Sequence, residues 1–221
     1  MVFKEIINTW KKESLLNQAY NDMEKMYALA HNVYVASIKV ALYKEKPELE
    51  VRKEDQEINK YEKQIRKKVL EHLTLNPKQD VTASLILTSI IIDIERIGDY
   101  AKNAIELKET YLKKFELDKY VKLLTGWDCE IKRFFALTKE ALDNSDTEKA
   151  KQIMERYFVM SKEIDEAIMK LAKDKKMSVE KAVTIVLLAR YLKRVGAHLY
   201  NIASSVANPF PKIGFKANGE E

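Results

Sequence analysis

The sequence is short of the two residues that protein chains use most often to turn. It has five glycines and four prolines among 221 residues, about 4% where an average protein has about 12%. Glycine allows positive φ and proline presets the corner of a tight turn, so sandwiches, barrels and α/β folds use many of both. The scarcity excludes these folds and favours long helices.

Cysteine and long apolar stretches are scarce as well. The single Cys129 excludes a disulfide framework and a cysteine-based zinc site. No stretch approaches the roughly 20 apolar residues that cross a bilayer. Residues 1–12 carry charges throughout and lack the apolar region of a secretory signal. We therefore expect a cytoplasmic protein.

Charge of one sign does not dominate. There are 39 basic and 34 acidic residues, which gives a net charge of +5. The basic clusters Arg66 to Lys68 and Lys173 to Lys176 stand among acidic residues, so solvated helix faces are expected there. No nucleic acid is expected as a partner, and contact with a membrane is expected only through partner proteins. Binding of nucleic acid or a membrane surface through the basic helices is a further alternative.

The spacing of apolar residues predicts six long helices and an irregular tail. They are expected over residues 3–43 (one helix or two nearly collinear ones), 47–75, 81–114, 118–143, 145–172 and 178–207. Long helices with short loops are typical of antiparallel bundles. The fold class is therefore all-α, with two tandem three-helix bundles. The expected units are residues 1–114, residues 115–208 and an irregular tail over 209–221.

Helix-terminal residues set several of these boundaries. Pro47 fits the first turn of the second helix, and Asp80 is a predicted N-cap for the third. Ser145 and Glu148 have the spacing of a capping box at the start of the fifth helix. Ser178 is expected to cap the sixth.

Two glycines in mid-helix positions reveal an internal repeat. Glycine costs about 1 kcal/mol of helix stability relative to alanine. We therefore expect a structural role for Gly98 and Gly196. A shift of 98 residues aligns residues 94–103 with 192–201, and Arg, Gly and Asn coincide. A shift of 106 aligns residues 55–59 with 161–165. The glycines are expected to let a neighbouring backbone approach closely.

Acidic and amide side chains recur on one face of two helices of the first half. Helical spacing places Glu95, Asp99, Asn103 and Glu106 on one stripe, and Asp55, Asn59 and Glu62 on another. Like charges one turn apart repel each other, so a positive group should offset them. Two alternatives are open. One is a hard cation such as Mg, Mn, Ca or iron in an all-oxygen site, and the other is pairing with Arg66, Arg96 or Lys102.

These segments resemble a known family. Residues 93–103, with the run Glu-Arg-Ile-Gly-Asp, and residues 55–62 are similar to signature motifs of the PhoU family of phosphate-uptake regulators. The helix order agrees up to about Ala207. The resemblance implies two repeats of a three-helix bundle and iron or zinc at acidic motifs in some members. The predicted metal ligands are Glu95, Asp99, Asp55, Asn59 and Glu62.

The resemblance also implies a function. It points to a non-enzymatic regulator that binds the ATPase subunit of a phosphate ABC transporter and a sensor histidine kinase, with a homodimer also expected. The alternative is a metal-dependent enzyme or metal-storage bundle. His31, His72 and His198 lack the Glu three residues earlier that di-iron bundles use, which weakens that alternative. His198 is expected to be a packing or surface residue.

The second half lacks the acids of the first. Lys193, Ala197 and Ser161 replace Glu95, Asp99 and Asp55. No metal is expected at these three positions. Lys193 is expected to pair with Asp165, so the chain should have at most one metal site.

Overall fold

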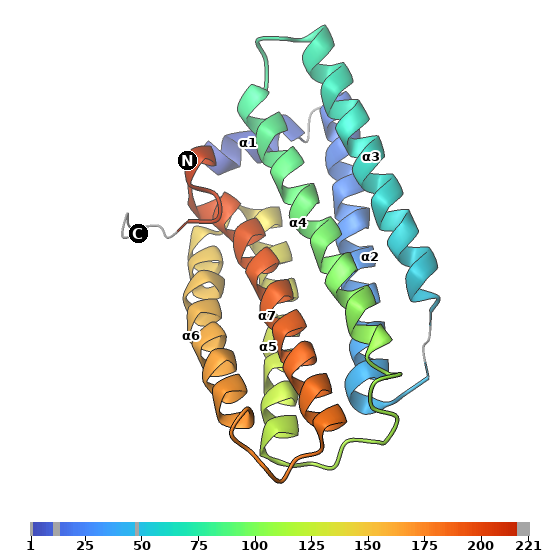
Figure 1. The fold of residues 1–221 in the computed structure, drawn as a ribbon. Helices are drawn as coiled ribbons and strands as arrows, with labels where there is room; N and C mark the ends of the chain where they lie inside the picture. The colour runs from blue at the N-terminus through green and yellow to red at the C-terminus, as the bar shows by residue number, and fades with distance from the viewer. Residues whose placement is uncertain (1, 11–13, 47–48, 216–221) are drawn as a thin grey trace.

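The described part of the chain, residues 2–10, 14–46 and 49–215 of a computed structural model, is all-helical (Figure 1). Its elements are α1 (Val2–Trp10), α2 (Leu15–Tyr43), α3 (Val51–Leu75), α4 (Val81–Glu106), α5 (Lys119–Asn144), α6 (Thr147–Leu171), α7 (Val179–Ala207) and the short 3-10 helix η1 (Phe210–Lys212). None of the described helices combines the length and the apolar character that crossing a membrane requires.

The described residues form seven α-helices, so the prediction of six was wrong. The expected first helix is two helices, and α1 lies across the bundle instead of continuing the line of α2 (Figure 1). The Ser14 side chain caps α2 by accepting a hydrogen bond from the Asn17 amide at 3.2 Å. Phe3, Ile6 and Ile7 of α1 are buried in the core, where α1 contacts α2, α4 and α7.

Two further boundaries differ from the prediction. The helix α4 ends at Glu106 instead of Lys114. Ser145 ends α5 in the left-handed conformation, with φ of 54°. The side chain of Asp146 caps α6 instead, by accepting hydrogen bonds from the amides of residues 148 and 149 at 3.1 and 3.0 Å.

The remaining predicted helix ends agree in part. Pro47 lies outside the described residues, and α3 begins at Val51. Asp80 precedes α4 but makes no capping hydrogen bond; its carboxylate contacts His72 Nε2 at 3.2 Å. Ser178 caps α7 as predicted. The tail is less irregular than expected, because it contains η1 and the Asn208 amide donates to the carbonyls of residues 212 and 215.

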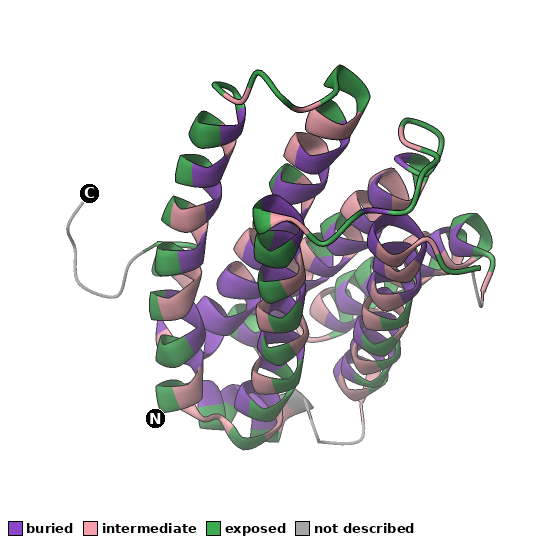
Figure 2. Cartoon of the chain, turned by 90° about the horizontal axis from the view of Figure 1, so that it is seen from below, coloured by how far each residue is buried: buried purple, intermediate pink, exposed green. Residues whose placement is uncertain are grey.

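The long helices pack in two sets that share one core. Helices α2, α3 and α4 contact one another, as do α5, α6 and α7, and the sets meet where α4 contacts α7 and α2 contacts α5. The buried faces, purple in Figure 2, turn toward the inside of the molecule. A single cluster of buried apolar side chains includes residues from all seven α-helices.

The mid-helix glycines make room for side chains. A Cβ atom at Gly98 would lie 3.0 Å from Ile58 Cδ1 and 3.6 Å from Asp55 Oδ1. At Gly196 it would lie 2.8 Å from Met160 Cε and 3.0 Å from Ile131 Cδ1. The nearest atoms belong to side chains of neighbouring helices, so the expected close approach of a backbone is wrong.

Candidate functional site

The charged face between α3 and α4 is centred on Lys102. The Lys102 ammonium donates to Asp55 Oδ2 and to Asp99 Oδ1, each at 2.9 Å. Asp55 comes from α3 and the other two residues from α4, so the lysine links the two helices. Asp55 is only 7% exposed. A carboxylate buried to this extent needs a charged partner, and Lys102 provides it.

The other predicted ligands on these two helices are paired as well. Arg66 contacts Glu62 at 2.8 Å, one turn away on α3. On α4, Arg96 contacts Asp99 at 3.3 Å and Glu95 at 3.6 Å. Arginine and lysine side chains therefore neutralise the acidic stripe, which is the pairing alternative of the sequence prediction.

Asn59 makes its hydrogen bond within its own helix. Its side-chain amide donates to the Asp55 backbone carbonyl at 2.9 Å, within the same helix. The structure therefore brings Asp55 and Asp99 together around one cation and leaves Asn59 in a local contact.

The electrostatics of the face follow from its burial and its crowding. Burial raises the pKa of Glu95, and the charges of Asp99, Glu62 and Asp55 raise it further against the opposing effect of Arg96. For Lys102, burial disfavours the ammonium. The hydrogen bonds and charges of its two aspartate partners outweigh this, so its pKa is raised. Both directions follow from the geometry, in which carboxylates of α3 and α4 surround the ammonium of Lys102.

In this arrangement the donor set does not fit a metal ion. Among the residues that the structure describes, no three His, Cys, Asp or Glu side chains are grouped so that they could hold one. Lys102 already contacts both Asp55 and Asp99, so a cation shared by these two carboxylates would compete with its ammonium. The metal site stays a prediction, and metal binding there would require competition with Lys102.

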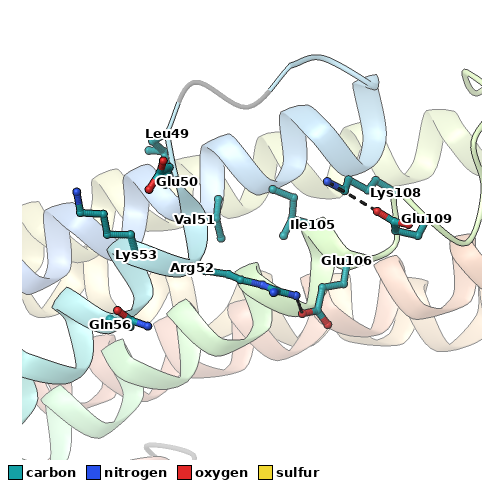
Figure 3. A pocket seen from close by; sticks show the side chains of 10 residues that line it. All are labelled: Leu49, Glu50, Val51, Arg52, Lys53, Gln56, Ile105, Glu106, Lys108 and Glu109. Atoms are coloured by element: carbon teal, nitrogen blue, oxygen red, sulfur yellow. Dashed lines mark hydrogen bonds and ion pairs between the residues drawn. The ribbon is translucent and has the colours of Figure 1, made fainter.

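A groove continues the charged face at the C-terminal end of α4. Its volume is about 1040 Å³, and it lies between the first turn of α3 and the end of α4 (Figure 3). Arg52 reaches across to Glu106 at 3.3 Å, and Lys108 lies 3.9 Å from Glu109 (Figure 3). Apolar side chains of Leu49, Val51 and Ile105 also line it. The groove offers apolar surface with charges of both signs.

The corresponding region of the second half has a different chemistry. Lys193 Nζ contacts Asp165 Oδ2 at 2.5 Å, which confirms the predicted pair. Tyr200 stands where the first half has Lys102. Its ring packs on Tyr157 with 5.4 Å between the centroids. Ring packing thus replaces the ion pairs that centre on Lys102.

One polar contact between the halves was missed at the sequence level. His198 Nδ1 lies 2.7 Å from Asp93 Oδ1, and the Asn201 amide donates to the same oxygen at 2.9 Å. The ring of Tyr100 stacks on His198 with 5.7 Å between centroids. His198 is therefore a packing residue, as expected. Its partner Asp93 lies in the motif of residues 93–103, but local spacing does not reveal a contact with a helix more than 100 residues away.

A second missed contact surrounds a fully buried acid. Asp128 of α5 is 0% exposed and accepts hydrogen bonds from Tyr34 at 2.9 Å, Tyr43 at 3.2 Å and Lys132 at 2.7 Å. Burial, and next the charge of Asp128, raise the pKa of Tyr43 to about 12. An aspartate on the apolar face of a predicted helix, beside Trp127, was a signal that could have found it.

Comparisons with known proteins agree with this architecture. The PhoU domain family matches residues 16–107 and 130–206. The phosphate-specific transport system accessory protein PhoU homolog of Deinococcus radiodurans is 28% identical over 167 residues, which are 71% of this chain and 76% of the relative.

Two solved structures share the fold. PhoU from Pseudomonas aeruginosa matches with a TM-score of 0.73 at 20% identity, over 87% of this chain and 95% of that one. The phosphate transport system regulatory protein PhoU from Streptococcus pneumoniae matches with a TM-score of 0.69 at 19% identity, over 86% and 92%.

Proposed function

Because this chain belongs to the PhoU family, we propose that it regulates a phosphate transport system by binding other proteins, without catalysis. The main support for this proposal is that the family match covers most of both helix sets, over residues 16–107 and 130–206. The D. radiodurans relative is named an accessory protein and the S. pneumoniae structure a regulatory protein.

The proposed partners are the ATPase subunit of a phosphate ABC transporter and a sensor histidine kinase. Both would be met in the cytoplasm, and the kinase would be held inactive when phosphate is plentiful. The long helices support this proposal, since helices of 25 to 29 residues present extended faces. Stable protein interfaces bury about 800 Å² on each partner, and extended helix faces can contribute to surfaces of this kind.

The pairing of the charged face supports binding over catalysis. A general acid or base needs a titratable group that is free to exchange a proton with a substrate. Asp55 and Asp99 are instead engaged by Lys102, and Glu62 is engaged by Arg66. The alternative of a metal-dependent enzyme or metal store would require these pairs to open. Turnover by the iron-loaded protein in a redox assay would favour that alternative.

Capture from cells tests the proposal. The tagged chain is expressed in its own organism in phosphate-rich medium, and captured proteins are identified by mass spectrometry. The transporter ATPase subunit and a histidine kinase are expected with the tagged chain and absent with the tag alone. Deletion of the gene should also switch on phosphate-starvation genes in the same medium. Recovery of neither protein, with unchanged gene expression, contradicts the proposal.

A homodimer is the remaining proposed assembly. Light scattering on the purified chain measures its mass in solution directly. Twice the mass of the 25.7 kDa chain is expected, and a mass that stays that of one chain at all concentrations contradicts the dimer.

A further inference from the structure

One end of the molecule concentrates the excess positive charge. Two loops meet there, residues 107–118 between α4 and α5 and residues 172–178 between α6 and α7 (bottom of Figure 1). Asp118 of the first loop pairs with Lys181 of α7 at 2.7 Å. Asp174 of the second loop pairs with Lys119 of α5 at 3.4 Å. We call residues 107–123 and 169–183 the lysine-rich end.

The lysine-rich end has ten lysines and five acidic residues. This excess equals the net charge of +5 of the whole chain. Two of the acids, Asp118 and Asp174, are neutralised by the ion pairs between the loops.

Most lysines of this end have no acidic partner. Six exposed lysines make no ion pair within the described part of the chain, namely Lys113, Lys114, Lys122, Lys173, Lys175 and Lys176. The exposed acids Glu116 and Glu180 are likewise without an ion pair there. The local field is therefore strongly positive.

Apolar side chains project among these lysines. Leu112 is 82% exposed, Leu117 71% and Val179 75%. Figure 2, which views the molecule from below, shows that both loops are largely exposed. Scattered exposed apolar residues are ordinary, but here three of the most exposed ones share one charged end.

The exposure of the two leucines is imposed by an anchored loop. Phe115, which lies between them in the sequence, is buried. Lys44, the residue that follows α2, donates to the Tyr111 backbone carbonyl at 2.5 Å, and its ammonium lies over the ring of Phe115 at 5.3 Å from the centroid. The loop thus buries Phe115 and leaves Leu112 and Leu117 exposed.

We propose that the lysine-rich end binds an anionic lipid surface. The unpaired lysines would lie against lipid phosphates, and Leu112, Leu117 and Val179 would enter the interface between headgroups and acyl chains. Each lysine near an anionic bilayer adds electrostatic attraction, and apolar side chains at the interface add burial that salt does not screen. From sequence alone the lysines suggest only a solvated face, and the projecting leucines are what the fold adds.

Lipid fits this end better than other polyanions do. Nucleic acid would engage the lysines through its phosphates, but it gives no role to leucines that project into solvent. An acidic protein surface would need a complementary shape, whereas a bilayer accommodates separate apolar tips.

Cosedimentation with vesicles tests the proposal. The purified full chain is mixed with vesicles of phosphatidylcholine containing phosphatidylglycerol, and with vesicles of phosphatidylcholine alone. Binding is expected only to the first kind. The triple variant K173E/K175E/K176E should weaken partitioning by about a hundredfold. The double variant L112S/L117S should weaken partitioning by about tenfold. The same tenfold difference from the wild-type chain is expected in high salt.

A matched control separates the lysine-rich end from net charge. The variant K63E/K78E/K162E makes the same change of charge with three exposed lysines that lie elsewhere and make no ion pair within the described residues. It should keep most of the binding. Circular dichroism confirms that each variant is folded.

Three outcomes would overturn the proposal. These are no binding to the anionic vesicles, equal loss in the control variant, and unchanged binding in the leucine variant with full competition by a DNA duplex. The last outcome would identify nucleic acid as the ligand. The vesicle assay contains no protein partner, so its failure leaves the proposed regulatory function standing, and the reverse also holds.

Discussion

At the residue scale, the pairing of Lys102 with two aspartates predicts a loss of stability when the ammonium is removed. In Lys102→Met, Asp55 stays buried without its cation, and the two carboxylates repel each other. The free energy of unfolding should fall by about 1 to 3 kcal/mol. Urea denaturation measures the change. The control Lys151→Met removes an exposed pair with Glu148 and should cost less than about 0.5 kcal/mol.

The same variant tests the metal prediction. In the wild-type chain Lys102 occupies the position between Asp55 and Asp99, so we expect less than one transition-metal ion per chain after dialysis against manganese, iron or zinc. Lys102→Met should bind more, since its aspartates are free to take a cation. Elemental analysis of both proteins measures the ratio. One or more ions per wild-type chain, or no gain in Lys102→Met, would contradict the expectation.

Replacing Glu95 by glutamine should stabilise the chain by an amount that depends on pH. Its pKa is raised in the folded state, so the folded chain holds an extra proton between the unfolded and folded pKa values. Stability therefore falls as pH rises through that window. Glu95→Gln removes the charge and should stabilise the chain by about 0.5 kcal/mol near pH 7. The gain should vanish near pH 3, where the wild-type side chain is protonated in both states. Thermal unfolding at the two pH values measures it.

The residues of the charged face could be predicted, but their partners could not. Helical periodicity alone places Glu95 and Asp99 on one stripe. It cannot decide whether a metal or Lys102 neutralises them, because both satisfy the same charge. The contact of Asp93 with His198 depends on how α4 and α7 meet, and the local pattern contains nothing about that.

At the scale of helices, three glycines predict three different responses to alanine. Gly196 is crowded by Met160, Ile131 and a third neighbour within 3.1 Å, so Gly196→Ala should destabilise the chain by about 1 to 3 kcal/mol. Gly126 of α5 is exposed, and a Cβ there would meet nothing within 4 Å. Gly126→Ala should therefore stabilise the chain by about 0.5 to 1 kcal/mol.

Gly98 provides the intermediate case. Its single close neighbour is the terminal methyl of Ile58 at 3.0 Å, which a small rotation can move, so Gly98→Ala should lie between the other two variants. Chemical denaturation ranks the three. A stabilised Gly196→Ala would show that this glycine is not required by packing.

Helix existence was predictable, whereas the break before α2 and the end of α4 were not. The apolar spacing continues through residues 3–43, and the break before α2 depends on the Ser14 cap, a polar signal that periodicity does not contain. Beyond Glu106, apolar residues such as Phe115 keep a helical spacing although the backbone has left the helix. There the residue is buried by the loop that Lys44 anchors, a tertiary contact.

At the scale of the whole molecule, the shared core predicts that both halves unfold together. One apolar cluster includes side chains of all seven helices, and Asp128 binds Tyr34 and Tyr43 of the other half inside it. Calorimetry should show one transition whose van't Hoff and calorimetric enthalpies agree.

Loss of the buried acid should weaken the molecule as a unit. Asp128→Ala should cost about 2 to 4 kcal/mol, since it leaves the buried Tyr34 hydroxyl without its acceptor. The single transition should move as a whole. The control Asp143→Ala removes a more exposed pair with Lys139 and should have little effect. Two separated transitions would contradict the shared core.

The lysine between Asp55 and Asp99 has a consequence for the protein in its cell. A metal must be acquired from the surroundings after synthesis, and its supply varies with nutrition. The ammonium of Lys102 is a counter-ion encoded in the gene and delivered with every copy of the chain. The acidic pair of α3 and α4 therefore has a counter-ion as soon as the chain has folded, whatever the supply of iron or zinc.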